Sequence, residues 1–348
     1  MKKLILLGVA VVLAATVIYL NNQSTTENQL ISIAGTTMGT SYHIKLSPGA
    51  GQKIDPTSIK QKVDARLTTI DNEMSTYKEL SDVSRISRAV TDTWEPVADE
   101  TMIVLTTAEE ISRISDGAFD VTVGQLVNLW GFGPALNLED MPDRREIEQL
   151  LAAVGYQQLE LQVYPPMVKK SNANVTVDLS AIAKGYAVDA IAKLLLDEQL
   201  SNFLVEIGGE IITHGYKEHN KPWVIGIESP QANQRSIRKR LYLQDVAMAT
   251  SGDYRNYFER DGVRYSHTID PATGYPIKHT LASVTVIEDS CMRADALATA
   301  IMVMGPEKGL TFANRHQLAI FMLVKQNDKF VETHSNAFTP YLNTKEVK

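Results

Sequence analysis

The sequence is poor in cysteine, in positive charge and in nucleotide-binding motifs. Cys291 is the only cysteine among 348 residues, which excludes an intrachain disulfide framework. The formal net charge is −7, so the chain is not expected to bind nucleic acid, because phosphate contacts need a basic face. No Walker loop, G-x-G-x-x-G, H-E-x-x-H or paired C-x-x-C occurs, so the common nucleotide and zinc signatures are also absent.

The amino terminus contains a long apolar run. Lys2 and Lys3 precede seventeen uncharged residues, 4–20, and a polar stretch, NNQSTTENQ, follows. This pattern predicts a signal anchor over 1–21 and a polar tether over 22–29, with the lysines inside the cytoplasm and the body outside it. Cleavage after Ala15 is the alternative. No Cys follows the run, so the segment carries no lipoprotein processing site.

Strand and helix patterns alternate irregularly after residue 30, and this predicts an α+β fold with mixed, largely antiparallel sheets in one domain over 30–340. The expected helices are 56–74, 100–115, 143–153, 184–197, 292–304 and 307–315. The expected strands are 30–34, 41–46, 159–163, 174–179, 203–207, 210–214, 223–228, 239–244, 264–269, 282–287, 317–324 and 329–333.

Residues 295–304, DALATAIMVM, predict a nearly all-apolar helix that Gly305 and Pro306 close. Asp295 and Thr299 are four residues apart and therefore lie on one face of that helix. A buried carboxylate is too costly to persist without a compensating partner. A metal ion, an Arg or a set of amide donors would each provide one.

The segment VDLSAIAKGYAVD, 177–189, predicts a strand that ends at Asp178 and a helix that begins near Lys184. Free backbone groups in such a turn can face a phosphate or coordinate a cation through a carbonyl. Each residue also has a plain structural interpretation: Ser180 as a helix cap, Lys184 as a solvated surface lysine, and Asp178 as the end of the strand.

Two further segments combine turn residues with side chains that can do chemistry. In SHTIDPATGYP, His267 and Asp270 stand beside a predicted turn, where either could act as a general base or only stabilise the turn. In DGAFDVTVG, a predicted strand presents Asp120 and Thr122 on one face, and Phe119 either packs in the core or covers a flat ring.

These segments occur together and in one order, and the chain resembles the ApbE family, the periplasmic FAD:protein FMN transferases, over about residues 30–335. The resemblance rests on TMGT (37–40), STY (75–77), DGAFDVTVGQLVNLWGFGP, VDLSAIAKGYAVD, ATSGDYRNYF, SHTIDPATGYPI and ADALATA. Two departures stand out. Many members begin with a lipoprotein signal and its Cys, and some carry Glu-Gly where this chain has Lys184-Gly185.

The resemblance implies a two-lobed fold that binds FAD between its lobes, with Mg²⁺ at the pyrophosphate. The implied metal ligands are the Ala181 carbonyl and the side chains of Asp295 and Thr299, and the small residues Ala296, Ala298 and Ala300 are then expected to let the helix approach the ion. The implied FAD contacts are Met38, Tyr77, Ala118, Phe119, Asp120, Asp178, Lys184 and Ile269.

The activity implied by the resemblance is Mg²⁺-dependent transfer of FMN from FAD to a Thr or Ser hydroxyl of an acceptor protein, with release of AMP. His267 and Asp270 are the candidate catalytic bases for that hydroxyl. The expected acceptor is a flavoprotein subunit of a membrane redox complex, and the expected location is the periplasmic side of the inner membrane. The alternatives are an FAD pyrophosphatase that yields FMN and AMP, and a non-catalytic, membrane-tethered FAD-binding protein.

Overall fold

The computed structural model describes residues 30–49, 51–134, 141–230, 236–252, 257–260, 263–327 and 329–342. The expected signal anchor, 1–21, and tether, 22–29, lie outside these ranges, as does 253–256 of the ATSGDYRNYF segment. Within the ranges described, no helix is both long enough and apolar enough to cross a bilayer.

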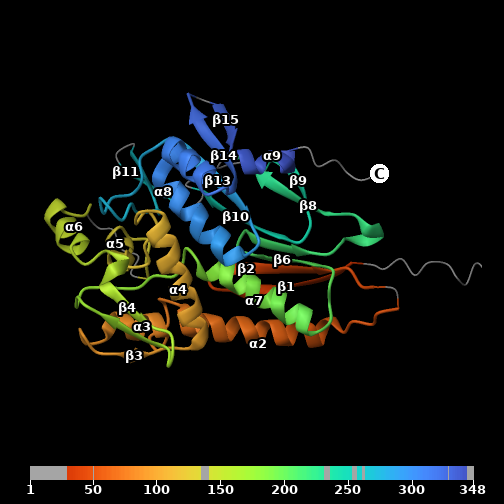
Figure 1. The fold of residues 1–348 in the computed structure, drawn as a ribbon, viewed down its shortest axis with the longest axis horizontal. Coiled ribbons are helices and arrows are strands. Elements are labelled where there is room, and N and C mark those ends of the chain that lie inside the picture. The colour runs from red at the N-terminus through yellow and green to blue at the C-terminus, as the bar shows by residue number, and fades with distance from the viewer. Residues whose placement is uncertain are drawn as a thin grey trace, which may run out of the picture.

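The centre of the fold is an eight-stranded sheet in which neighbouring strands all run antiparallel (Figure 1). In spatial order, its strands are β1 (Ile31–Thr37), β2 (Thr40–Leu46), β6 (Phe203–Ile207), β7 (Glu210–His214), β10 (Val246–Gly252), β13 (Leu281–Glu288), β14 (Ala319–Gln326) and β15 (Lys329–His334). The predicted α+β class with antiparallel pairing is therefore confirmed.

Both faces of this sheet are covered, and side-chain alternation along the strands explains how. In β14, Met322 belongs to the main core, whereas its neighbours Phe321 and Leu323 belong to a second apolar cluster on the opposite face. Helices α2 (Pro56–Met74), α4 (Asp99–Ile114), α7 (Ala183–Asp197) and α8 (Cys291–Arg315) contribute to the main core (Figure 1). The hairpin of β8 (Trp223–Glu228) and β9 (Ile237–Leu243) covers the second cluster.

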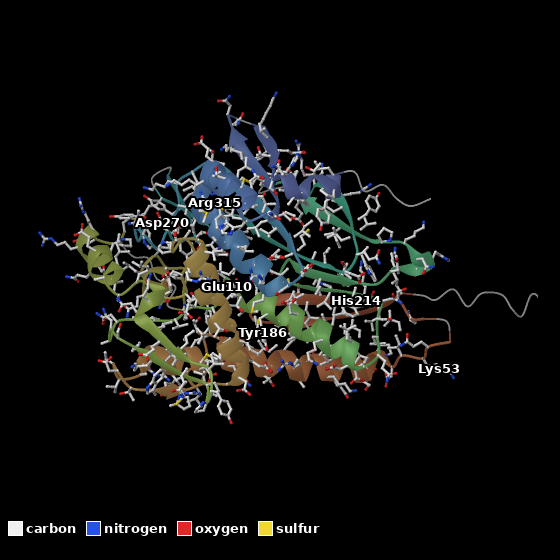
Figure 2. The ribbon with its side chains drawn as sticks, viewed as in Figure 1. Lys53, Glu110, Tyr186, His214, Asp270 and Arg315 are labelled. Carbon is white, nitrogen blue, oxygen red and sulfur yellow. The ribbon has the colours of Figure 1, made fainter. Side chains whose placement is uncertain are left out.

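A smaller lobe of short elements lies at one end of the sheet, on the left of Figure 1. It contains α3 (Asp82–Arg88), α5 (Gly124–Leu129), α6 (Arg144–Leu151) and a sheet of β3 (Glu95–Pro96), β5 (Met167–Lys170) and β4 (Leu159–Gln162). The hairpin of β11 (Tyr257–Arg260) and β12 (Val263–Ser266) packs against it, and α9 (Thr339–Leu342) ends the described chain. Glu110 of α4, labelled in Figure 2, accepts a hydrogen bond from Arg293 of α8 at 2.8 Å and joins the two helices.

Several expected elements differ from those observed. Residues 174–179 form no strand beyond a single bridge between Val123 and Thr176, and 118–123 form turns instead of the expected strand. The expected strand 264–269 ends at Ser266. The helices expected at 292–304 and 307–315 form one continuous element, α8, but Gly305, with a φ of 77°, interrupts the helical geometry between them, so the expected break at Gly305 and Pro306 is confirmed.

Glu73, in the last turn of α2, gives a pH-dependent prediction for stability. Burial, with added repulsion from Glu100 and Asp82, raises the pKa of Glu73 to about 7, although Arg66 opposes the shift. The folded protein thus holds this proton more tightly than the unfolded chain, so the stability that Glu73 contributes is present below about pH 4.5 and lost as the pH rises through about 7. We expect Glu73→Gln to raise the melting temperature at pH 8 but hardly at pH 4.5.

Scanning calorimetry at the two pH values measures this difference. Glu79→Gln is the matched control, because Glu79 is exposed and lies only six residues further along the chain. An equal change of melting temperature at both pH values for Glu73→Gln would contradict the prediction.

Candidate active site

Helices α7 and α8 cross at a glycine, and this contact positions the predicted metal-ligand segments. A Cβ atom on Gly185 would lie 2.4 Å from the Cys291 carbonyl oxygen and 2.7 Å from the Met292 Cα, so only glycine permits the approach. The Gly185 amide donates a hydrogen bond of 3.1 Å to Oδ2 of Asp295, which is 5% exposed. The carboxylate that the sequence left without a partner therefore has an amide donor from the neighbouring helix.

Asp189 caps the first turn of α8 from α7. Its Oδ1 accepts from the Cys291 amide at 2.8 Å, and its Oδ2 accepts from Ser290 Oγ at 2.7 Å and the Met292 amide at 3.0 Å. Burial raises the pKa of Asp189, although these three donors oppose the shift. This cap fixes α8 one turn before Asp295. In the sequence, the only signal for Asp189 was its position at the end of the 177–189 motif.

Lys184 lies between two carboxylates. Its Nζ is 3.2 Å from Oε1 of Glu210 and 3.5 Å from Oδ2 of Asp295, and its side chain is 27% exposed, so the solvated-surface interpretation is wrong. Burial lowers the pKa of Lys184, but the charges of Asp295 and Glu210 outweigh burial and raise it above its usual value. Burial raises the pKa of Glu210 to about 8, with Lys184 opposing and Asp295 adding to the shift.

Two of the three candidate metal ligands lie on α8, and the third lies in the turn that leads into α7. Ala181 is in the turn just before α7, and Asp295 and Thr299 are one helical turn apart on α8. Among the described residues, both hydrogen bonds to the Asp295 carboxylate fall on Oδ2, which leaves Oδ1 for another ligand. When Glu210 is ionised, above a pH of about 8, two carboxylates and one ammonium give the site an excess negative charge, and its oxygen ligands suit a hard cation.

Charged metal ligands are few in this arrangement. Within the described ranges, no three His, Cys, Asp or Glu side chains gather into a metal-binding group. A cation bound here would rely on one carboxylate together with the hydroxyl and carbonyl oxygens. Such a sparse set suits Mg²⁺, which keeps water and substrate oxygens in its shell.

The predicted FAD contacts on the amino-terminal side come from two turns. Met38 and Gly39 form the two-residue connection between β1 and β2, with φ of 47° and 71°, as a tight hairpin requires. Tyr77 follows α2 and is 69% exposed. An exposed aromatic ring at a helix end is available to stack on a flat ligand.

Asp120 holds the segment 118–123, together with the Val123–Thr176 bridge and a 2.8 Å hydrogen bond from the Asp178 amide to the Val121 carbonyl. Asp120 Oδ1 accepts from the amide and the hydroxyl of Thr122 at 2.8 and 2.6 Å, and Oδ2 accepts from the Tyr156 amide at 2.7 Å. Burial raises the pKa of Asp120 against these donors. Phe119 is 2% exposed and packs in the main core, whereas Ala118 is half-buried and offers accessible surface.

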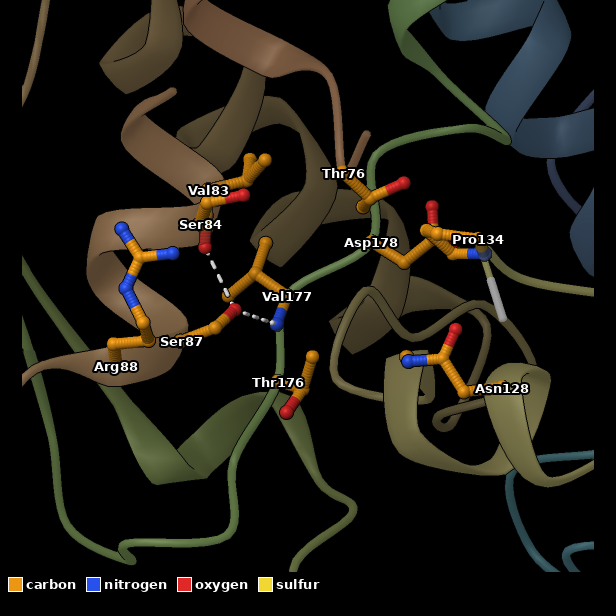
Figure 3. Close-up of a pocket in the computed structure, with 11 residues that line it drawn as sticks. Thr76, Val83, Ser84, Ser87, Arg88, Asn128, Pro134, Thr176, Val177 and Asp178 are labelled. Carbon is orange, nitrogen blue, oxygen red and sulfur yellow. Dashed lines mark hydrogen bonds between the residues drawn. The ribbon is translucent and has the colours of Figure 1, made fainter. Parts of the chain in front are cut away.

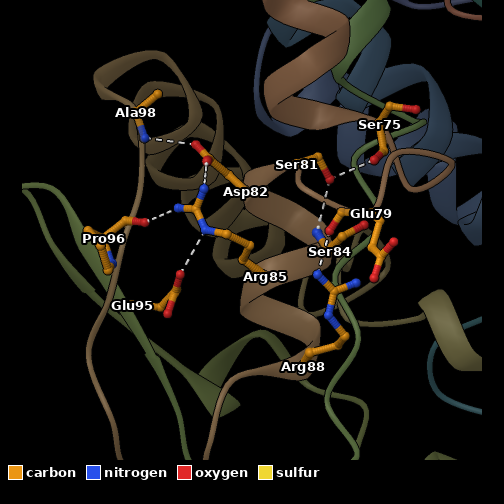
Figure 4. A network of polar contacts seen from close by, with 10 residues as sticks. All are labelled: Ser75, Glu79, Ser81, Asp82, Ser84, Arg85, Arg88, Glu95, Pro96 and Ala98. Carbon is orange, nitrogen blue, oxygen red and sulfur yellow. Dashed lines mark hydrogen bonds and ion pairs between the residues drawn. The ribbon is translucent and has the colours of Figure 1, made fainter.

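A pocket of about 130 Å³ lies between α3, α5 and the extended segment that ends at Asp178 (Figure 3). Ser87 Oγ accepts a 3.1 Å hydrogen bond from the Val177 amide and so joins α3 to that segment. A polar network behind it includes Arg85, which binds Glu95 at 2.8 Å and Asp82 at 2.9 Å (Figure 4). The pocket is lined by Thr76, Val83, Ser84, Ser87, Arg88, Gly124, Asn128, Pro134, Thr176, Val177 and Asp178.

The segment 266–276 forms the expected turn. Asp270 Oδ1 accepts from the Ala272 amide at 2.9 Å, and Oδ2 accepts from Thr273 Oγ1 at 3.0 Å, so both oxygens are engaged within the turn. Ile269 is 5% exposed and packs in a small cluster with Leu126, Trp130 and Ile147. His267 is half-buried, and its ring lies edge-on to Phe132 with centroids 6.3 Å apart.

Comparison with known proteins identifies the family, since the model of the ApbE family matches residues 38–322. The chain belongs to the ApbE family. It is 42% identical over 315 residues to the FAD:protein FMN transferase of Vibrio cholerae, with 90% of this chain and 93% of that protein covered. It is 37% identical to the protein of that name from Escherichia coli K12, with 89% and 88% covered.

Solved structures of the ApbE family share the fold. The flavin transferase ApbE from Vibrio cholerae superposes with a TM-score of 0.84 at 41% identity, covering 90% of this chain and 99% of that one. The apo form of Pseudomonas stutzeri flavinyl transferase ApbE also gives a TM-score of 0.84, at 39% identity, covering 93% and 100%. The resemblance inferred from the motifs is thus confirmed.

Proposed function

We propose that this chain transfers FMN from FAD to a Thr or Ser hydroxyl of an acceptor protein and releases AMP, in a reaction that depends on Mg²⁺. The observation that carries the proposal is the α7–α8 crossing, where Asp295 keeps one carboxylate oxygen for a cation beside the Lys184 ammonium. Support comes from the relatives named FAD:protein FMN transferase, which match about nine-tenths of the chain.

The residues of the crossing are suited to hold a diphosphate in place. The Lys184 ammonium and the amino-terminal end of α7 attract anionic oxygens, and Asp295, Thr299 and the Ala181 carbonyl would hold Mg²⁺. When bound, the ion neutralises negative charge on the phosphates as it develops. Most of the rate then comes from positioning and electrostatics within a fixed site.

A basic side chain is needed to accept the proton of the acceptor hydroxyl. The hydroxyl oxygen forms a bond to the phosphorus attached to riboflavin, the bond from that phosphorus to the bridging oxygen breaks, and AMP leaves. His267 is proposed as the base, since an imidazole nitrogen can take up a proton, and both oxygens of Asp270 accept hydrogen bonds that stabilise their turn. Asp270 then serves to hold the segment that carries His267.

We expect His267→Gln to lower the rate of transfer about 100-fold or more, with little change in FAD affinity, because general-base catalysis acts on the chemical step. Asp270→Asn should cost less than tenfold if its oxygens only stabilise the turn. Rates of FMN incorporation at saturating FAD, measured from pH 5 to 9, compare the two variants. A larger loss for Asp270→Asn than for His267→Gln would reverse the assignment.

One incubation separates transfer from the other activities open to such a site. The full chain is mixed with FAD, MgCl₂ and an exported flavin subunit of a membrane redox complex. A fluorescent acceptor band on a denaturing gel together with AMP supports transfer. AMP and free FMN without a fluorescent band indicate hydrolysis. If neither AMP nor FMN is formed, FAD binding is the only remaining activity.

Residues 1–21 are proposed to anchor the protein in the inner membrane with its body in the periplasm, where exported flavin subunits would be accessible. The proposal rests on the two lysines before the uncharged run, residues 4–20. Proteinase treatment of spheroplasts tests it: the body should be digested from outside, and protection of the body would reject this orientation.

A further inference from the structure

Glu210 is a buried carboxylate that the proposed chemistry has not used. It begins β7, directly after the Gly208-Gly209 turn that follows β6, and it is 4% exposed. Its Oε1 lies 3.2 Å from Lys184 Nζ, and its Oε2 is buried and has no hydrogen-bond partner among the described residues. A buried carboxylate with a single long contact is costly unless it serves the site around it.

The Gly208-Gly209 turn brings Glu210 against the end of the Lys184 side chain. Gly208 has a φ of +63°, and a Cβ atom there would lie 3.3 Å from Lys184 Cδ and 3.4 Å from Glu210 Oε2. The strand pairing of Ile207 with Glu210 closes this turn. The position of the Glu210 carboxylate is therefore set by the sheet, and the position of Lys184 is set by α7.

The Lys184 ammonium forms ion pairs with one carboxylate on the sheet and with another on α8. The ammonium is 3.2 Å from Glu210 and 3.5 Å from Asp295, so neither ion pair has the short distance of an exclusive one. If Glu210 lost its charge, the ammonium would keep its ion pair with Asp295 and its 3.4 Å hydrogen bond to the Ser180 carbonyl, and the attraction to Asp295 would no longer be opposed by that to Glu210. An ammonium paired closely with Asp295 would compete with any cation that needs this carboxylate.

We propose that ionised Glu210 is a positioning residue that draws the Lys184 ammonium away from Asp295 and thereby keeps the Asp295 carboxylate available to Mg²⁺. The inference rests on the proposed function, because it assumes that Asp295 holds the ion. Glu210 itself acts through Lys184 and is not a ligand in this arrangement.

The test is calorimetric titration of the full chain with MgCl₂, with and without FAD, at pH 9, where Glu210 is ionised. Glu210→Gln keeps the size of the side chain and removes its charge, and we expect it to raise the dissociation constant for Mg²⁺ about tenfold or more, as loss of an outer partner of a metal ligand does. Glu210→Asp restores the charge and should recover much of the affinity. An unchanged dissociation constant in Glu210→Gln would overturn the proposal.

Glu206→Gln is the matched control on the same β6–β7 hairpin. Its carboxylate binds His43 Nδ1 and the Gly209 amide, each at 2.7 Å, and has no contact with Lys184 in the structure. Mg²⁺ affinity should be unchanged in this variant. An equal loss in both variants would show that the hairpin's charge or fold, rather than the Glu210–Lys184 pair, is responsible.

A double-mutant cycle tests whether Glu210 acts through Lys184. In a Lys184→Met background, Glu210→Gln should change the Mg²⁺ dissociation constant less than about twofold. A tenfold loss in that background would mean that Glu210 binds the ion directly and would overturn the positioning role. If the unchanged protein binds no Mg²⁺ with or without FAD, the proposed metal site itself fails, and no role remains for Glu210 toward it.

Discussion

Asp295→Asn is expected to lower the rate of FMN transfer about 1,000-fold while the protein keeps its fold, because the carboxylate is the only charged ligand in the proposed metal site. Asn can still accept the hydrogen bond that the Gly185 amide donates to Oδ2 at 3.1 Å. The variant therefore removes the charge without stranding the buried amide. Asp295→Ala should also stop turnover, with an added loss of stability from the unpaired donor.

Three measurements check this result: fluorescent acceptor bands, released AMP, and the melting temperature with and without MgCl₂. Mg²⁺ should raise the melting temperature of the unchanged protein and not that of Asp295→Asn, since a ligand stabilises only the state that binds it. Asp289→Asn, an exposed carboxylate just before α8, is the control and should behave as the unchanged protein. Full activity in Asp295→Asn would remove this carboxylate from the chemistry.

The sequence was sufficient to find the chemical segments because their spacing is local. Asp295 and Thr299 occupy one helix face by the i, i+4 rule, and Ala181 and Lys184 fall in the turn and first residues of α7. Glu210 was missed because its partner comes from another element. Only the pairing of β6 with β7, and the packing of α7 on both, brings Lys184 within 3.2 Å of it.

The sequence was less sufficient for elements whose pairing depends on distant segments. Strand β10 was not predicted, because VAMATSG has small residues and no clear alternation, yet it pairs with both β7 and β13 in the centre of the sheet. The reverse error occurred at 174–179, where Val175 and Val177 alternate toward the core but the backbone makes only one bridge. An alternating apolar pattern predicts which side chains are buried, but it does not predict whether the backbone pairs with a neighbouring strand.

The sequence did not mark the residue that lets α7 and α8 approach each other. Ala296, Ala298 and Ala300 are at most 1% exposed and pack in the main core. The tight contact in the structure is at Gly185, whose added Cβ would meet the Cys291 carbonyl at 2.4 Å. A glycine inside a helix is a recognisable signal, but the helix that it faces cannot be read from the local sequence.

Gly185→Ala is accordingly expected to reduce both stability and activity. The added methyl group forces α7 and α8 apart, and overpacking of this kind costs about 1–3 kcal/mol of unfolding free energy. Ala also favours a helix over Gly by about 1 kcal/mol, and this gain offsets part of the destabilisation by the clash. The measured loss of unfolding free energy is therefore smaller than the cost of the clash itself. Because the Gly185 amide bonds to Asp295, the same separation should displace the carboxylate and lower transfer about 100-fold.

Denaturant unfolding and FMN transfer, measured on the same preparations, test both effects together. Gly49→Ala is the matched control, because a Cβ atom there would meet only the Gln52 side chain, at 3.7 Å. A stable Gly185→Ala protein that still loses transfer would mean that the helices separate cheaply and that activity depends on their distance. Unchanged stability and unchanged transfer would show that the crossing does not hold Asp295 in place, and the site would then need another means of orienting its carboxylate.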